Sequence, residues 1–547
     1  MPQDKEKAES LKALANELYS KKDFKGAYQK YTEAIKADGT NAIYYANRAA
    51  ASLGMQQFMN ACTDADKAIE LDPKYAKAHA RYAAGHAGLG RFETAAKSWR
   101  RALALLPQVD SQLSPTERKL KEQFEAELSK AETNAKAPLK DAIGLGQDEV
   151  SKTPWHRAIA EEQNLRAEEN ANSSGWLMIH AYREFSEGVD AMKSLKVVKK
   201  DGRQGMFGRL DCIVNISNGL MREPRVFHIN SPDWFEKLNN QIMFEVGRSG
   251  GWSNVGPKVI MEDAPKRLRK GGWESVRPAI STTVRAWIVS GCLSSRMSNQ
   301  SGPAYEFFSR AIELLEWGRI MWKDVSTEER GVVFERSFIR GIKRMKLESM
   351  IAILVSKENC SFTKKKVADE ALHIIEDAEA NPPQGTLDPG FVLSFWVYPR
   401  AEAMAAIGWY HIQSGFASTT AETAKTAFSE AHKFYLRASQ ALPPDEENTF
   451  QYLYVALEAL WFAGESLQKQ LPLLSDLDTT GQKIMRFWAM SSASERTHGH
   501  MAMTTAYRNQ VMSGLSSGKY ELSNVVKPIN VKSVDKFPNS ATIYVKL

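Results

Sequence analysis

The stretch NAIYYANRAAASLGMQQFMNACTDADKAIELDP, Asn41 to Pro73, decides the fold of the first part of the chain. Its alanines Ala49, Ala61 and Ala68 each have a counterpart 34 residues before and 34 residues after. These counterparts are Ala15, Ala27 and Ala34 in the preceding unit and Ala83, Ala95 and Ala102 in the following unit. Gly39, Pro73 and Pro107 close the three units. A fixed period of this length predicts three stacked units that share one continuous core.

Each unit is expected to be a helical hairpin, because small residues allow two helices to approach closely and Pro cannot continue a helix. Small residues at positions 8, 20 and 27, with Pro at position 32, resemble the tetratricopeptide repeat. At position 24, where that family has an aromatic residue, the units carry Tyr31, Ala65 and Trp99, and Gly39 replaces the first Pro. The resemblance implies a three-repeat superhelix, and the run Ser114 to Asn134 is expected to cap it with a polar outer face.

The first helix of each hairpin should line the concave side of such a superhelix. On a helical wheel Leu11, Leu14, Ala15 and Leu18 form a stripe that we expect to be buried. Lys12, Asn16 and Tyr19 fall on the neighbouring face. The corresponding groove positions of the later repeats hold only small residues, which should leave room for a peptide backbone: Ala46, Ala50, Gly54, Ala80, Ala84 and Gly88.

Five hydrogen-bonding side chains project into this groove: Lys12, Asn16, Asn47, Lys77 and Arg81. They are three cations and two amides, and no carboxylate is expected among them. Charge-assisted hydrogen bonds contribute about 1.5–3 kcal/mol each. The set suits a ligand that presents two carboxylates at one place, as a peptide ending in Asp does.

The pattern Lys-x-x-x-Asn, then Asn-Arg-Ala, then Lys-x-x-x-Arg is similar to the dicarboxylate clamp of tetratricopeptide co-chaperones. The resemblance implies that residues 8–135 bind the Glu-Glu-Val-Asp tail of seventy- or ninety-kilodalton heat-shock chaperones. It implies that the five polar residues hold the terminal carboxylates. Tyr19 and Leu53 are expected to provide apolar contact to the preceding side chains of the peptide.

The rest of the chain should be mostly helical. Residues 136–154 are expected to be a linker, residues 155–525 a larger helical domain and residues 526–547 an irregular or extended tail. Ala431, Tyr435, Ala438 and Pro443 reproduce the repeat offsets, and Ala304, Phe308 and Ala311 reproduce three of them. We therefore expect an all-α protein with a second, degenerate repeat array, although similar spacings occur in any packed helical domain.

A less regular insert is expected at about 200–275. Within it, DCIVNIS, Asn218-Gly219 and LMREPRVFHI (Asp211 to Ile229) predict a β-hairpin, because Asn-Gly suits a tight turn. The Gly-rich run from Gly247 to Gly256 predicts a loop.

The composition is that of a globular protein of two to four domains: 547 residues, 43% hydrophobic, with a net charge of +7. Cys62, Cys212, Cys292 and Cys360 are isolated, which favours reduced thiols in a cytoplasmic or nuclear protein. The polar start MPQDKEKAESLK does not resemble a signal peptide, and no apolar run is long enough to span a membrane.

No catalytic, cofactor or metal motif emerges, so we expect an adaptor rather than an enzyme. His498 and His500 are more typical of a polar surface than of a metal site. The basic runs Lys266–Lys270 and Ile339–Lys346 favour solvated or protein-contact surfaces over nucleic acid. The larger domain is expected to bind a client or a second partner. Two alternatives stay open: a scaffold for other acidic peptides, and an enzyme of unknown chemistry in residues 155–547.

Overall fold

The computed structural model describes residues 2–109, 113–136, 151–200, 203–229, 231, 233–297, 301–529 and 542–545. The described chain is almost entirely helical, as predicted, with two small two-stranded sheets. It forms two compact units. The first takes its residues from Met1–Ala142, Asn239–Glu335 and Ala352–Ser361, and the second from Ile143–Leu238, Arg336–Ile351 and Phe362–Leu547. No described helix is long and apolar enough to cross a bilayer.

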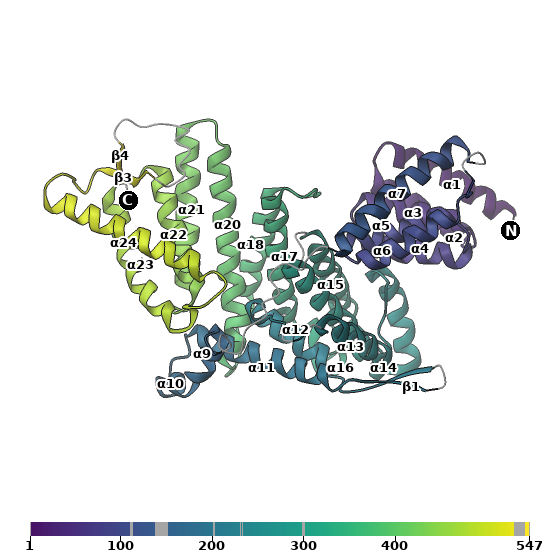
Figure 1. Cartoon of the computed structure of the whole chain (residues 1–547), viewed down its shortest axis with the longest axis horizontal. Coiled ribbons are helices and arrows are strands. Elements are labelled where there is room, and N and C mark those ends of the chain that lie inside the picture. The colour runs from purple at the N-terminus through teal and green to yellow at the C-terminus, as the bar shows by residue number, and fades with distance from the viewer. Residues whose placement is uncertain are drawn as a thin grey trace. The chain divides into compact units, whose positions relative to one another are not determined.

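The three predicted hairpins are present at the N-terminus, and each helix packs against the next (Figure 1). They are α1 (Pro2–Ser20) with α2 (Phe24–Ala37), α3 (Ala42–Gly54) with α4 (Phe58–Leu71), and α5 (Ala76–Gly88) with α6 (Phe92–Ala104). All nine alanines of the 34-residue period are completely buried. A larger side chain at any of them would push two helices apart, so the period read from the sequence is the packing period of the fold.

A buried ion pair lies within the second hairpin, and its arginine also reaches the first hairpin. Arg48, on α3, places its guanidinium on the carboxylate of Asp64, on α4, with Nη2 2.6 Å from Oδ1. Its Nη1 also donates to the hydroxyl of Thr32 on α2, at 3.2 Å. Arg48 therefore connects three helices.

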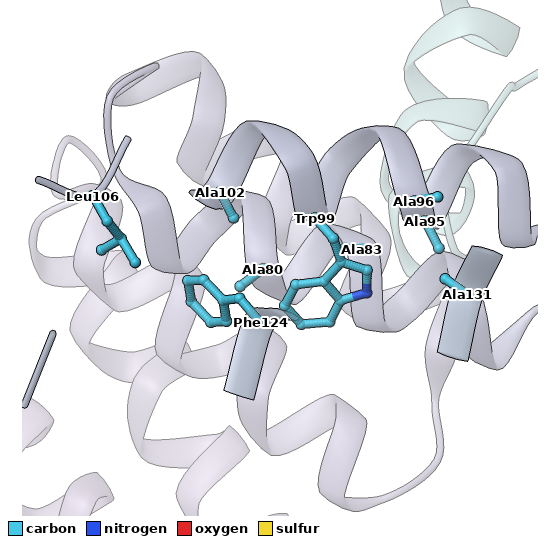
Figure 2. Close-up of a cluster of buried hydrophobic side chains, with 9 residues drawn as sticks. All are labelled: Ala80, Ala83, Ala95, Ala96, Trp99, Ala102, Leu106, Phe124 and Ala131. Carbon is cyan, nitrogen blue, oxygen red and sulfur yellow. The ribbon is translucent and has the colours of Figure 1, made fainter. Parts of the chain in front are cut away.

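The capping helix is α7 (Pro115–Lys136). It starts with a capping box, in which Ser114 N–H donates to Glu117 Oε2 at 2.9 Å and Glu117 N–H donates to Ser114 Oγ at 3.2 Å. Trp99 of α6 lies against Phe124 of α7 with ring centroids 5.3 Å apart, among small side chains of α5 and α6 (Figure 2). The predicted cap is confirmed, and it closes the core of the third repeat.

The repeats pack against later residues of the same unit. Glu306 of α15 (Gly302–Met321) accepts the N–H of Met59 at 3.2 Å, in the first turn of α4. The hydroxyl of Thr63 accepts the N–H of Gly256 at 2.7 Å, and Arg91 donates to Asn254 at 2.9 Å. The first unit thus contains residues 239–335, which the sequence analysis placed in a separate helical domain, residues 155–525. The predicted domain boundaries remain a prediction. Most of the expected linker, residues 137–150, lies outside the described residues.

Two long helices of the first unit pack against each other, as the helices of each repeat do. They are α14 (Pro257–Met297), interrupted by the non-helical Gly272, and α15. A Cβ added at Gly291 of α14 would lie 2.6 Å from the ring of Phe308. Ala304, Phe308 and Ala311, the predicted echo of the repeat, are all buried.

The second unit contains the other stretch that reproduces the repeat offsets, from Ala431 to Pro443. Its helices are α9 (Pro154–Ala160), α10 (Glu162–Ala167), α11 (Ser174–Lys193), α12 (Cys212–Arg222), α18 (Lys364–Ala380), α19 (Pro389–Val392), α20 (Tyr398–Ala417), α21 (Ala421–Ala441), α22 (Glu447–Ala463), α23 (Leu467–Trp488) and α24 (Ser494–Ser516). α20, α21 and α22 pack in succession (Figure 1). Gly408 lies so close to Tyr435 that an added Cβ would meet its ring at 2.7 Å.

Two helices run across the division between the units: α13 (Trp234–Ser249) and α17 (Arg336–Ser356). Short elements join the longer helices. They are α16 (Thr327–Arg330), the 3-10 helices η2 (Pro224–Val226) and η3 (Val332–Phe334), and the π-helical turn η4 (Leu393–Val397).

The insert holds helices, loops and one hairpin, but the hairpin predicted for residues 211–229 is wrong. Those residues form α12 and η2, and the hairpin lies earlier, with β1 (Lys196–Lys200) antiparallel to β2 (Arg203–Phe207). Gly219 sits inside α12 because an added Cβ would come within 2.7 Å of the Ala181 carbonyl oxygen on α11. The dipeptide Asn218-Gly219 therefore allows close helix packing and does not form a turn.

The predicted loop at the end of the insert is confirmed from residue 250, after α13 has ended at Ser249. In the tail, β3 (Val525–Pro528) pairs in parallel with β4 (Thr542–Val545).

Candidate peptide-binding site

The five predicted clamp residues lie on the first helices of the three repeats. Lys12 and Asn16 lie on α1, Asn47 lies on α3, and Lys77 and Arg81 lie on α5. In each pair on one helix, the spacing of four residues places both side chains on the same face.

A short hydrogen-bond chain brings Asn16 and Asn47 together. The hydroxyl of Tyr31 donates to Oδ1 of Asn16 at 2.6 Å. Nδ2 of Asn47 donates to the same oxygen at 3.5 Å. Because Oδ1 of Asn16 already accepts two hydrogen bonds, the Nδ2 group of Asn16 is the part of this amide that remains to donate.

Lys12 differs from the expectation. Its ammonium forms an ion pair with Glu9, one helical turn earlier, and the other oxygen of Glu9 accepts the hydroxyl of the buried Tyr44 at 2.6 Å. The hydrogen bond from Lys12, followed by that from Tyr44, lowers the pKa of Glu9 below its ordinary value. The expectation that no carboxylate neutralises the groove cations is therefore wrong at Lys12. A side chain three residues away on a helix is a neighbour, so the spacing could have revealed the pair.

Lys77 and Arg81, unlike Lys12, have no carboxylate partner in the described part of the chain. Lys77 is exposed and Arg81 is partly buried, and neither forms an ion pair or hydrogen bond with any residue in the described part of the chain. Burial, with a smaller effect from Tyr19, raises the pKa of Tyr31 to about 12, while the positive charge of Arg81 opposes the shift. Arg81 of the third repeat is thus within electrostatic reach of Tyr31 in the first repeat, which itself contacts Asn16.

Other expected groove positions have structural roles. An added Cβ at Gly54 would lie 2.6 Å from the ring of Phe24, and one at Gly88 would lie 2.3 Å from the ring of Phe58. These glycines therefore make space for aromatic side chains of the preceding hairpin and not for a ligand. Ala46, Ala50 and Ala80 are buried in the helix packing.

Leu14, expected in the buried stripe, has 43% of its surface exposed. Tyr19 is partly buried and packs edge-on against Phe24 with ring centroids 5.3 Å apart. Leu53 is also partly buried. Both keep some accessible apolar surface, and their contact with a peptide stays a prediction.

Members of both basic runs form ion pairs, and one histidine of the pair stacks on an aromatic ring. In the run 339–346, Arg340 pairs with Asp377, Arg344 pairs with Glu402 and Lys346 pairs with Glu370. Arg267 pairs with Asp263. His500 stacks on Tyr454 with ring centroids 3.8 Å apart. No group of three or more His, Cys, Asp or Glu side chains in the described ranges is arranged to hold a metal ion.

The chain is similar to proteins that contain such repeats. It is 42% identical over 99 residues to the small glutamine-rich tetratricopeptide repeat-containing protein 2 of Saccharomyces cerevisiae, which is 18% of this chain and 29% of that protein. It is 32% identical over 145 residues to the Hsp70-Hsp90 organizing protein of Triticum aestivum, which is 26% of this chain and 23% of that protein. The three N-terminal hairpins, α1 to α6, form a tetratricopeptide-repeat domain.

A solved structure is also similar, the second tetratricopeptide domain of human RPAP3 in complex with the HSP70 peptide SGPTIEEVD. Sequence identity is 32% and the TM-score is 0.21, covering 24% of this chain and 98% of that domain. The chain spans less than a third of the length of the two relatives. No protein-family model matches it.

Proposed function

We propose that residues 8–135 clamp the acidic C-terminal tail, of the Glu-Glu-Val-Asp type, of seventy- or ninety-kilodalton heat-shock chaperones, and that the protein is a co-chaperone adaptor. The observation that carries the proposal is the pair Lys77 and Arg81. Both cations lie on one face of α5, and neither forms an ion pair with a carboxylate in the described chain. A ligand carboxylate would supply the missing counter-charge.

The other clamp residues have complementary roles. Asn16 and Asn47 would donate amide hydrogen bonds that orient the terminal carboxylates, and Lys12 would add a third cation once it exchanges Glu9 for the ligand. A micromolar Kd corresponds to about 8 kcal/mol, which a few such bonds and the apolar contacts of Tyr19 and Leu53 can supply. The organizing protein of wheat, whose name refers to Hsp70 and Hsp90, is a relative and supports this assignment.

The larger part of the chain would bring a second protein. Beyond the repeats, helices such as α14 with α15 and α20 with α21 pack in pairs, and stacked helical pairs present extended surfaces to protein partners. We expect this part to bind a client or second partner, with the whole protein acting in the cytoplasm without catalysis of its own.

The test is retention of a purified seventy-kilodalton chaperone on the immobilised full-length protein. Retention is expected for the wild type, and loss is expected for Lys77→Ala/Arg81→Ala. Loss is also expected when the chaperone lacks its last four residues. The matched control is Lys97→Ala/Arg101→Ala, which removes two exposed cations from α6 of the same repeat. Equal retention by the clamp variant and this control would refute the clamp.

A further inference from the structure

A cavity of about 240 Å³ lies in the second unit, outside the repeat domain. It is formed where the last turn of α18 and the first turns of α20 meet the last turns of α21. Its lining residues are Glu379, Arg400, Met404, Arg437, Gln440 and Ala441.

The two arginines of this cavity differ from the arginines of α17, which pair with carboxylates of α18 and α20. Nε of Arg400 is buried and has no hydrogen-bond partner. Neither Arg400 nor Arg437 is within ion-pair distance of a carboxylate among the residues that the structure describes. By contrast, the neighbouring Arg340 and Arg344 both pair with carboxylates. Buried polar groups without partners are rare in folded proteins, so Arg400, with the exposed Arg437 beside it in the lining, points to a ligand.

The lining selects the chemical class of that ligand. Guanidinium groups bind carboxylate and phosphate oxygens in pairs of parallel hydrogen bonds, and the amide of Gln440 can add another donor. Glu379 leaves the lining with one net positive charge, which a single carboxylate balances and a phosphate dianion exceeds.

The size and the apolar part of the lining indicate a side chain. Cavities that enclose drug-sized ligands measure about 300–1,000 Å³, so this one is too small for most metabolites. Met404, which is almost fully buried, and Ala441 offer apolar contact to the methylene groups of a glutamate.

We propose that the Arg400–Arg437 cavity binds a carboxylate side chain from an acidic peptide segment of a partner protein. The site is separate from the repeat groove and does not depend on it. It gives the second unit a defined recognition chemistry, which the clamp proposal leaves open.

The test uses the full-length protein carrying Lys77→Ala/Arg81→Ala, so that the groove does not contribute. The probe is a fluorescent hexaglutamate peptide with a blocked N-terminus and an amidated C-terminus, titrated by fluorescence anisotropy at low salt. Arg400→Ala/Arg437→Ala should weaken binding at least tenfold. Lys483→Ala/Arg496→Ala removes two exposed cations from α23 and α24 and should change binding less than twofold. A hexaglutamine peptide should not bind.

The variant Glu379→Gln should change the affinity for hexaglutamate in the opposite direction. Removing this carboxylate should tighten hexaglutamate binding at least twofold, whereas unchanged or weaker binding would contradict the proposal. If the double variant unfolds, the single variant Arg437→Ala can be titrated in its place. Arg437 is exposed and its described contact is with the ring of Phe434, so the fold should tolerate the change. It should weaken binding at least threefold at an unchanged Tm, and an unchanged Kd would overturn the site.

Discussion

Asn16 and Tyr31 are joined by a hydrogen bond of 2.6 Å from the tyrosine hydroxyl to Oδ1 of the amide. Tyr31 is the aromatic residue at position 24 of the first repeat, and only 2% of its surface is exposed. Tyr31 is therefore a core residue of the repeat that also orients Asn16, one of the predicted clamp residues. The bond fixes which end of the Asn16 amide can donate to a ligand.

Tyr31→Phe should weaken binding of a chaperone-tail peptide. The ring and its packing remain, so the free energy of unfolding should fall by only about 0.5–1.5 kcal/mol, the value of one net hydrogen bond. Without the hydroxyl, the Asn16 amide can rotate, and we expect the Kd to rise about threefold to tenfold. Titration calorimetry checks this against Tyr45→Phe, which removes only a 3.3 Å bond to the Gly39 carbonyl. An unchanged Kd would refute the orienting role of Tyr31.

Glu9→Gln should strengthen binding of the same peptide. The ligand carboxylate has to replace Glu9 at the Lys12 ammonium, and removing the competing charge makes this exchange easier. We expect a decrease in Kd of about twofold to fivefold, as for a partly screened ion pair. Glu17→Gln is the matched control, since Glu17 pairs with Lys21 near the end of the same helix. Weaker binding by Glu9→Gln would show that Glu9 positions Lys12 instead.

Trp99→Ala should loosen the third repeat and its cap. The indole is almost fully buried between α5, α6 and α7, and truncations of this kind cost about 3–5 kcal/mol (Figure 2). Amide hydrogen exchange of α6 and α7 is the suitable measurement, because a chain of two units need not unfold in one step. Lys97→Ala, on the exposed face of α6, should leave the exchange unchanged. Unchanged exchange in Trp99→Ala would mean that the cap is held by other contacts.

Glu458, on α22, predicts a pH dependence of stability. Desolvation raises the pKa of this carboxyl from its ordinary value of 4.5 to about 7. The folded state therefore holds a proton that the unfolded state releases. The stabilising contribution is complete below about pH 4.5 and is lost as the pH rises through about 7.

Glu458→Gln removes this titration. The Tm of the variant relative to wild type should increase between pH 5 and pH 8, measured by scanning calorimetry. Glu430→Gln is the control, because Glu430 is partly exposed and pairs with Lys433. A Tm difference that stays constant with pH would contradict the raised pKa.

The sequence was sufficient for the repeats because their packing is periodic. Every alanine of the 34-residue period is buried, and the Ser114–Glu117 capping box begins the helix that was expected there. The Lys12–Glu9 pair was overlooked although its spacing on one helix allows it, whereas the bond from Tyr44 to Glu9 joins α3 to α1 and is not contained in a single helical wheel. The same limit explains Gly54 and Gly88, whose neighbours are on the preceding hairpin.

The hairpin predicted at Asn218-Gly219 failed for a related reason. The dipeptide has a strong local preference for a turn, but here the glycine allows α12 to approach α11. Tertiary packing decided the outcome over local preference. The hairpin that does form, β1 with β2, was not anticipated, although the dipeptide Asp201-Gly202 between the two strands in the sequence favours a two-residue hairpin turn.

The most direct test of the central claim is titration calorimetry of the full-length protein with a chaperone-tail peptide ending in Glu-Glu-Val-Asp, beside the same peptide with an amidated C-terminus. The account predicts a micromolar Kd for the free acid and binding at least tenfold weaker for the amide, because one of the two carboxylates is lost. Lys77→Ala/Arg81→Ala should remove this difference. Equal affinity of the wild type for both peptides would contradict the clamp.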